Sequence, residues 1–85
     1  MPDNEPPAAT ALRSVIAAKV RGRLAEHQKT QRDLGEVLNL PQSAIALRLS
    51  GKRPFRAEEL GLIAQWLSVP VEVFVPAPAA EVGAA

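Results

Sequence analysis

The sequence predicts a compact all-α domain of four to five helices. Apolar residues recur at three- and four-residue spacing in several segments, which is the period of a helix with one buried face. Capping residues, prolines and glycines separate these segments at short intervals. The one β-prone stretch, residues 69–75, is short and contains Pro70, which disfavours a position inside a sheet.

The composition excludes several classes of protein. The 85 residues suffice for one small domain, and the absence of cysteine with a single histidine, His27, predicts no disulfide, no metal site and no cofactor. No apolar run approaches the roughly 20 residues that span a bilayer, and residues 1–5 are acidic, unlike a signal peptide. We therefore expect a cytoplasmic protein without a membrane partner or a small-molecule substrate.

Charge is unevenly distributed along the chain. Residues 13–56 contain all ten basic residues and three acidic ones, a net charge of +7, and the flanks contain the other six acids. The overall net charge of +1 thus hides a basic middle of the kind that binds phosphate. An ordinary solvated surface would give the same distribution, so charge alone does not assign a function.

Proline and alanine mark both ends of the predicted domain. Residues 1–9 and 76–85 are expected to form a disordered arm and a disordered tail, which leaves residues 10–75 as the folded domain. Thr10 is a candidate cap for the first helix. One apolar face then follows over four turns, formed by Leu12, Val15, Ile16, Val20 and Leu24.

Two short helices are predicted next, over residues 31–38 and 42–49. Thr30 and Asp33 resemble a capping box at the start of the first, and Asn39 tolerates the left-handed conformation that ends a helix. Pro41 then permits a new helix to begin at once. A linker of three residues is too short for an antiparallel hairpin of two helices with large side chains, so it forces the steep crossing of a helix-turn-helix.

The last part of the domain closes the core. Ser50 and Gly51 end the third helix, and Glu58 and Glu59 lie in the first turn of a fourth, where acids suit the helix dipole. Residues 71–74 are expected to form a final short turn or helix. We expect its apolar residues to divide between closing the core and forming a dimer surface; they are Val71, Val73 and Phe74. Trp66 is expected to be a core contact or a dimer contact.

The outer face of residues 42–49 is the candidate base-reading surface. It carries Gln42, Ser43, Ala46 and Leu47, and a glutamine can bond an adenine edge at two atoms in the major groove. Simple capping and solvation would explain Gln42 and Ser43 if they stood alone. Leu47 is interpreted either as a contact to a thymine methyl or as a core residue.

Basic residues around this helix are candidate phosphate contacts. They are Arg32, Lys52, Arg53 and Arg56, and the alternative is that they are idle surface charges. No enzyme is expected, because the sequence offers no nucleophile paired with a base. Glu58 and Glu59 are helix neighbours that point in different directions, which argues against a catalytic carboxylate pair.

The sequence resembles the Cro and lambda-repressor-like helix-turn-helix family, also called XRE-type. The residues that carry the resemblance are 30–45, 49–55, 59–60, 63–64 and 67–70. The resemblance covers about residues 12–75. It implies that Gln31 and Gln42 act as a pair, in which Gln31 holds Gln42 and contacts the DNA backbone while Gln42 reads a base. It also implies that Gly35 is the small residue where the two helices meet, that Ile45 anchors the recognition helix, and that Lys52 and Arg53 grip phosphate.

The sequence departs from the family pattern at two positions. Asn39 replaces the usual turn glycine, which its left-handed tolerance allows. Arg48 stands where the family usually has an inward-facing apolar residue, and burying an unpaired guanidinium is costly. We expect Arg48 to pair with a carboxylate of the fourth helix, Glu59 before Glu58, with its stem on Leu60; the alternative is that it swings outward to phosphate.

Three functions fit these observations. The first is a sequence-specific regulator that binds double-stranded DNA, a phage-like or bacterial repressor acting as a possible homodimer. The second is the antitoxin of a toxin–antitoxin pair, in which the same fold binds DNA and a toxin protein. The third is a protein-interaction module that has lost DNA binding. The basic middle of the chain and the Gln42–Ser43 face favour the first.

Overall fold

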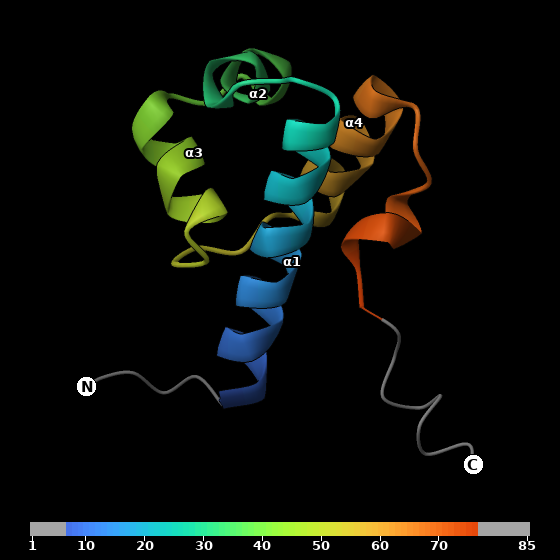
Figure 1. Cartoon of the computed structure of the whole chain (residues 1–85). Helices are drawn as coiled ribbons and strands as arrows, with labels where there is room; N and C mark the ends of the chain where they lie inside the picture. The colour runs from blue at the N-terminus through green and yellow to red at the C-terminus, as the bar shows by residue number, and fades with distance from the viewer. Residues whose placement is uncertain (1–6, 77–85) are drawn as a thin grey trace.

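The computed structural model describes residues 7–76, and this part of the chain folds into helices without any strand (Figure 1). Four are α-helices: α1 (Pro7–Glu26), α2 (Gln31–Leu38), α3 (Gln42–Leu49) and α4 (Ala57–Leu67). A short 3-10 helix, η1 (Val71–Phe74), follows. The predicted all-α fold class is confirmed, and α2, α3 and η1 cover the residue ranges expected from the sequence.

The first helix begins earlier than predicted. Pro7, Ala8 and Ala9 belong to α1 although they were expected in a disordered arm, and Thr10 lies inside the helix instead of capping it. Proline suits the first turn because its missing N–H needs no partner there, and alanine is the best helix former. Residues 1–6 and 77–85, the remainder of the predicted arm and tail, lie outside the described residues.

Local side-chain chemistry sets both ends of α2. The Thr30 hydroxyl accepts the Asp33 N–H at 3.0 Å, and the Asp33 carboxylate accepts the Thr30 N–H at 2.8 Å, so the predicted capping box is confirmed. The bonds that Asp33 makes with the backbone and side chain of Thr30 hold the pKa of this carboxyl below its ordinary value. At the other end Asn39 has a φ of 55°, the left-handed conformation expected of it.

The core lies where α1, α3, α4 and η1 converge beneath α2. α2 packs on α3 and α4, and α1 packs on α3 and η1. Phe74 is fully buried and Val73 is half-buried against the core, so the predicted closing of the core by η1 is confirmed. Val71 is exposed, and its use in a dimer surface stays a prediction. The other buried apolar residues are Ala17, Val20, Leu24, Leu34, Ile45, Leu49, Leu60, Ile63, Ala64 and Leu67.

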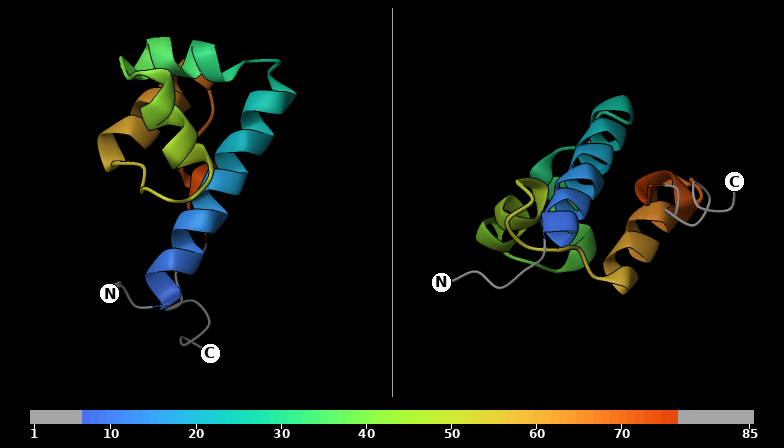
Figure 2. Two further views of the ribbon diagram at one scale, coloured as in Figure 1. Left: turned by 90° about the vertical axis from the view of Figure 1, so that its left-hand side faces the viewer. Right: turned by 90° about the horizontal axis from the view of Figure 1, so that it is seen from below.

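The view from the α3 side shows how this packing leaves α3 on the outside of the molecule (Figure 2, left). α3 lies in front, α2 crosses its upper end, and the first half of α1 runs beside the loop that follows α3. None of the helices formed by residues 7–76 combines the length and the apolar character needed to span a membrane.

Candidate nucleic-acid interface

The joint between α2 and α3 depends on a glycine. A Cβ atom added at Gly35 would lie 3.1 Å from the Leu40 carbonyl oxygen and 3.6 Å from the side chain of Ile45. Ile45 is fully buried, and the Leu40 N–H donates to the Gly35 carbonyl at 3.0 Å. Gly35 and Ile45 therefore occupy the structural positions that the family resemblance implies, and this close approach sets the angle between the two helices.

The outer face of α3 is free of protein contacts that would hide it. Gln42, Ser43, Ala46 and Leu47 are all exposed. Leu47 is 37% exposed, which removes the interpretation that it is a core residue and leaves it available to a ligand. The four side chains predicted to contact bases thus share one accessible surface, on a helix that fits a major groove.

Two glutamines connect α2 to α3 across the turn. The Gln42 side-chain amide donates to the Gln31 side-chain oxygen at 3.1 Å, and both residues are exposed. Gln31 is the first residue of α2 and Gln42 the first of α3, so each end of the bond stands on a helix terminus. The pairing implied by the resemblance is present, and it restricts the orientation of Gln42 before any ligand arrives.

The basic loop after α3 is tied to that helix by its backbone. The N–H groups of Lys52 and Arg53 both donate to the Leu47 carbonyl, at 3.0 and 3.2 Å, while their side chains are exposed. Two cations therefore stand just past the C-terminus of α3. Arg32 is exposed in the first turn of α2, and Arg56 is exposed next to the start of α4.

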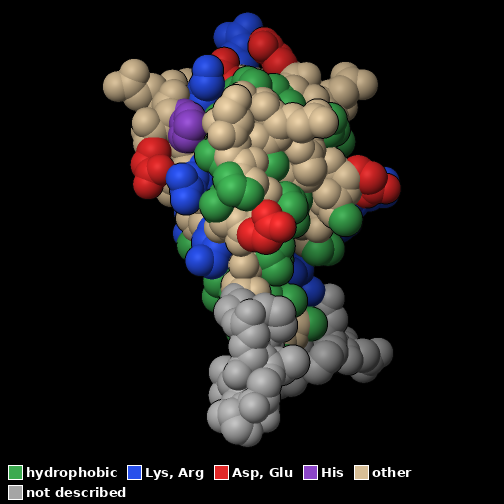
Figure 3. All heavy atoms as spheres, turned by 90° about the vertical axis from the view of Figure 1, so that its right-hand side faces the viewer, with side chains coloured by type: hydrophobic (Ala, Val, Ile, Leu, Met, Phe, Trp, Pro, Cys, Tyr) green, Lys and Arg blue, Asp and Glu red, His purple; other side chains and the backbone are tan. Residues whose placement is uncertain are grey.

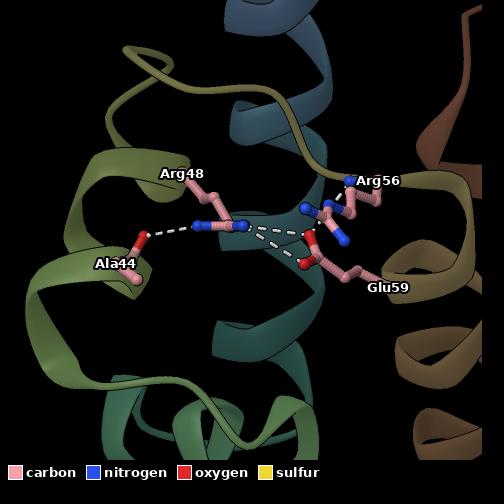
Figure 4. Close-up of polar contacts among 4 residues, drawn as sticks. All are labelled: Ala44, Arg48, Arg56 and Glu59. Carbon is pink, nitrogen blue, oxygen red and sulfur yellow. Dashed lines mark hydrogen bonds and ion pairs between the residues drawn. The ribbon is translucent and has the colours of Figure 1, made fainter.

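Arg48 points inward and pairs with Glu59, as predicted (Figure 4). Its Nε donates to Glu59 Oε1 at 2.9 Å and its Nη2 to Glu59 Oε2 at 3.2 Å, which is the two-pronged geometry that a guanidinium makes with a carboxylate. The third nitrogen, Nη1, donates to the Ala44 carbonyl at 3.3 Å. The side chains are 15% and 12% exposed, so the pair is largely buried and joins the inner side of α3 to α4.

Glu59 also serves the start of its own helix. Its Oε1 accepts the N–H of Arg56, the residue before α4, at 2.9 Å. Burial raises the pKa of the Glu59 carboxyl, but the bonds from Arg48 and from the Arg56 backbone outweigh it, and the pKa lies below its ordinary value of 4.5. One carboxylate thus joins α3, α4 and the loop between them.

Two arginines that the sequence analysis did not single out bond the end of α3 and the loop after it. Arg21 Nη1 donates to the Leu49 carbonyl, and Arg13 Nε donates to the Gly51 carbonyl at 3.3 Å. Both come from α1 and are 28 or 38 residues from their partners. No local motif marks such contacts, because they depend on how α1 lies against the end of α3.

The acidic residues and the one tryptophan are the alternative candidate sites. Within residues 7–76 no three His, Cys, Asp or Glu side chains gather in a way that could hold a metal ion. Trp66 is half-buried against the core, and the Lys29 ammonium lies 5.5 Å from its ring centre. This contact occupies a face of the indole, in keeping with a structural use of Trp66.

No family model and no curated protein matches the sequence. The structure is similar to the crystal structure of a hypothetical transcription factor, NHTF, from Neisseria, with a TM-score of 0.69 and 16% sequence identity. The match covers 100% of this chain and 98% of that one. At this identity the similarity shows the fold, and we conclude that the chain is an all-helical domain of the helix-turn-helix kind with the fold of that protein.

Proposed function

We propose that this protein is a sequence-specific regulator of transcription that binds double-stranded DNA. The observation that carries the proposal is the outer face of α3, where Gln42, held by Gln31, stands among exposed residues and is followed by the exposed cations Lys52 and Arg53. A helix whose exposed face combines polar with small or apolar side chains, and which has cations beyond its end, suits a major groove. The structurally similar Neisseria protein is described as a hypothetical transcription factor, which agrees with this use of the fold.

Gln42 has the atoms needed to recognise adenine. One amide hydrogen is given to Gln31, which leaves the side-chain oxygen of Gln42 and its second hydrogen for a base. Adenine presents a donor at N6 and an acceptor at N7, and these two groups match the two free groups of Gln42. We assign Ser43 and Ala46 to neighbouring base contacts and Leu47 to a thymine methyl.

Phosphate contacts complete the proposed interface. We assign them to the side chains that flank α3 on both sides, namely Gln31, Arg32, Lys52, Arg53 and Arg56. Such contacts orient a protein on DNA without reading its sequence. We propose that binding occludes a promoter in the cytoplasm of a bacterial or phage-infected cell, and that the domain needs neither a cofactor nor a catalytic step.

Binding-site selection from random duplexes tests this function. The wild-type protein should enrich a defined sequence, and Gln42→Ala should lose preference for adenine at one position, a discrimination of about 1–3 kcal/mol. Gln65→Ala is the matched control, because Gln65 is an exposed glutamine of α4 and should leave the selected sequence unchanged. Enrichment of no sequence by the wild type would overturn the proposal.

Exposed apolar side chains on and beside α4 and η1 support binding of a protein partner in addition to DNA. Leu62, Val71 and Val75 are 44%, 39% and 46% exposed, and Figure 3 shows hydrophobic side chains on this side of the molecule. We propose that a second copy of the chain covers them, because one small domain makes few base contacts and two copies double them. An antitoxin would use this face for its toxin, in which case a second polypeptide would co-purify in a fixed ratio.

A further inference from the structure

The C-terminus of α3 is closed by side chains from α1. A helix leaves its last four carbonyls without partners inside the helix, and in α3 these belong to residues 46–49. Backbone N–H groups of residues 50–53 donate to the carbonyls of Ala46, Leu47 and Arg48. The fourth carbonyl, that of Leu49, accepts the Arg21 guanidinium. A cation at this end of a helix also suits its dipole.

The next turn of the chain is held from α1 as well. Arg13 donates to the carbonyl of Gly51, and Gly51 has a φ of 83°, a left-handed conformation that favours glycine. A Cβ atom added at Gly51 would lie 3.2 Å from the Ser14 hydroxyl oxygen and 3.3 Å from the Ser14 Cα. The backbone of the loop therefore packs directly against the backbone of α1, between the two arginine contacts.

The two arginine bonds and the packing of Gly51 on Ser14 affect the DNA-binding surface, because the cations of that surface follow Gly51 in the chain. Lys52 and Arg53 follow Gly51 immediately, and their N–H groups donate to the Leu47 carbonyl of α3. Any tilt of the end of α3 would move both cations relative to Gln42 at the other end of the helix. Positioning of this kind matters because base contacts and phosphate contacts have to form together on one duplex.

We propose that Arg21 and Arg13 are positioning residues for the DNA-binding surface. Arg21 donates to the carbonyl of Leu49, the last residue of α3, and Arg13 donates to the carbonyl of Gly51 in the loop that follows, and together they fix Lys52 and Arg53 relative to Gln42. This inference rests on the proposed function. It assigns to α1 a role in DNA binding that requires no contact between its arginines and phosphate.

The first experiment examines the free protein, so its result does not depend on DNA. Amide hydrogen exchange is measured for residues 50–53 in the wild type, Arg21→Met, Arg21→Lys and Lys19→Met. Arg21→Met should raise exchange at Lys52 and Arg53 about tenfold, the effect of losing one charge-assisted hydrogen bond. Arg21→Lys keeps a donor and should recover part of the protection. Arg13→Met should act at the same amides.

Lys19→Met is the matched control. Lys19 lies two residues before Arg21 on the same helix, which places it about 200° around the axis and away from α3. It is exposed, and its substitution removes the same charge from the chain. We expect no change in exchange at residues 50–53 and no change in DNA affinity beyond a small general effect of charge.

The second experiment measures affinity, per folded molecule, for a duplex recovered by binding-site selection, over a range of salt concentrations. Arg21→Met should weaken binding about tenfold with the salt slope unchanged, because no phosphate contact is lost. A slope shallower by about one unit would show that Arg21 contacts phosphate directly and would overturn the proposal. Unchanged affinity together with faster exchange would overturn it too, since the contact would then stabilise the fold alone.

The two experiments separate failure of this inference from failure of the proposed function. If the wild-type protein binds no duplex, the proposed function is wrong and the positioning role falls with it, while the exchange data still show whether α1 closes the end of α3. If the wild type binds DNA and exchange in Arg21→Met equals that of the wild type, the positioning role alone is wrong. Should Arg21→Met fail to fold, Arg13→Met supplies the same comparisons, because it should act at the same amides.

Discussion

Arg48 and Glu59 form the polar contact on which the inner side of α3 depends. A single substitution leaves one charge buried without its partner, whereas removing both charges avoids that cost. The side chains are 15% and 12% exposed, so solvent can compensate only a little. Arg48 is therefore assigned to stability, and its two-pronged bond to Glu59 replaces the alternative in which it swings out to phosphate.

We predict that Arg48→Met lowers the free energy of unfolding by about 3 kcal/mol, because Glu59 then loses its cation. The double variant Arg48→Met with Glu59→Gln should be less destabilised than the sum of the single variants, since no lone charge remains. Urea denaturation measures all three. DNA affinity per folded molecule should stay close to wild type. A loss of binding with a shallower salt slope and unchanged stability would place Arg48 at the interface.

The lowered pKa of Glu59 leads to a prediction of how stability depends on pH. Its pKa is lower in the folded chain than its ordinary value of 4.5, so the ionised form stabilises the fold. This contribution is present above pH 4.5 and is lost as the pH falls through the folded pKa. The difference in unfolding free energy between wild type and Glu59→Gln should therefore shrink as the pH falls from 4.5 through the lower pKa of the folded protein. A constant difference down to strongly acidic pH would contradict this account.

Lys52 and Arg53 are predicted to act on DNA through charge. Substitution of either by alanine should weaken binding to specific and random duplexes alike, and should reduce the salt slope by about one unit. Lys19→Ala is the control, since this exposed residue lies on α1 away from α3. Titrations at several salt concentrations measure the slopes. An unchanged slope for both variants would remove these residues from the interface.

At the level of elements, the turn between α2 and α3 depends on one backbone conformation. Asn39 adopts a φ of 55°, which costs most residues other than glycine about 1–2 kcal/mol. Its N–H then donates to the Glu36 carbonyl at 3.4 Å, at the end of α2. The turn thus joins the C-terminal end of α2 to the start of α3, where Gln42 lies, through a residue that tolerates the left-handed conformation.

We predict that Asn39→Ala lowers the unfolding free energy by about 1 kcal/mol, because alanine is strained in this conformation. Asn39→Gly should stay within about 0.5 kcal/mol of wild type, since glycine adopts it readily. Thermal denaturation at neutral pH measures both. Equal stability of the alanine and glycine variants would show that the backbone at this turn relaxes instead of bearing strain.

For the whole molecule, the proposed dimer makes a geometric prediction. Two copies on DNA should cover half-sites about one helical turn apart, because each α3 reads one face of the duplex. Substitution of Val71 and Val75 by aspartate should weaken dimer formation, as each carries exposed apolar surface on or beside η1. Val15→Asp is the matched control, an exposed valine of α1. A footprint over one half-site, with one chain per duplex at saturation, would refute the dimer.

Much of this architecture could be read from local chemistry. The bounds of α2 and α3 follow from Thr30, Asp33, Asn39 and Pro41, whose capping and backbone preferences act within a few residues. The pairing of Arg48 with Glu59 was also predictable, because a charged residue on the inner side of α3 requires a partner on the helix that follows. The early start of α1 was missed, since Pro7 and the alanines after it suit a helix and a disordered arm equally well.

The sequence by itself determined the all-α class, the helix-turn-helix and which residues of α3 face outward at its start, because periodicity and caps are properties of short segments. Only the tertiary structure decided that Leu47 is exposed and that Phe74 is buried. It alone also decided that Arg21 bonds the end of α3 and that Arg13 bonds the loop after it. These features depend on how α1 and η1 pack against segments far away in the chain. The packing of the helices decides which side chains become buried or bonded to another element, and a local sequence pattern does not contain that information.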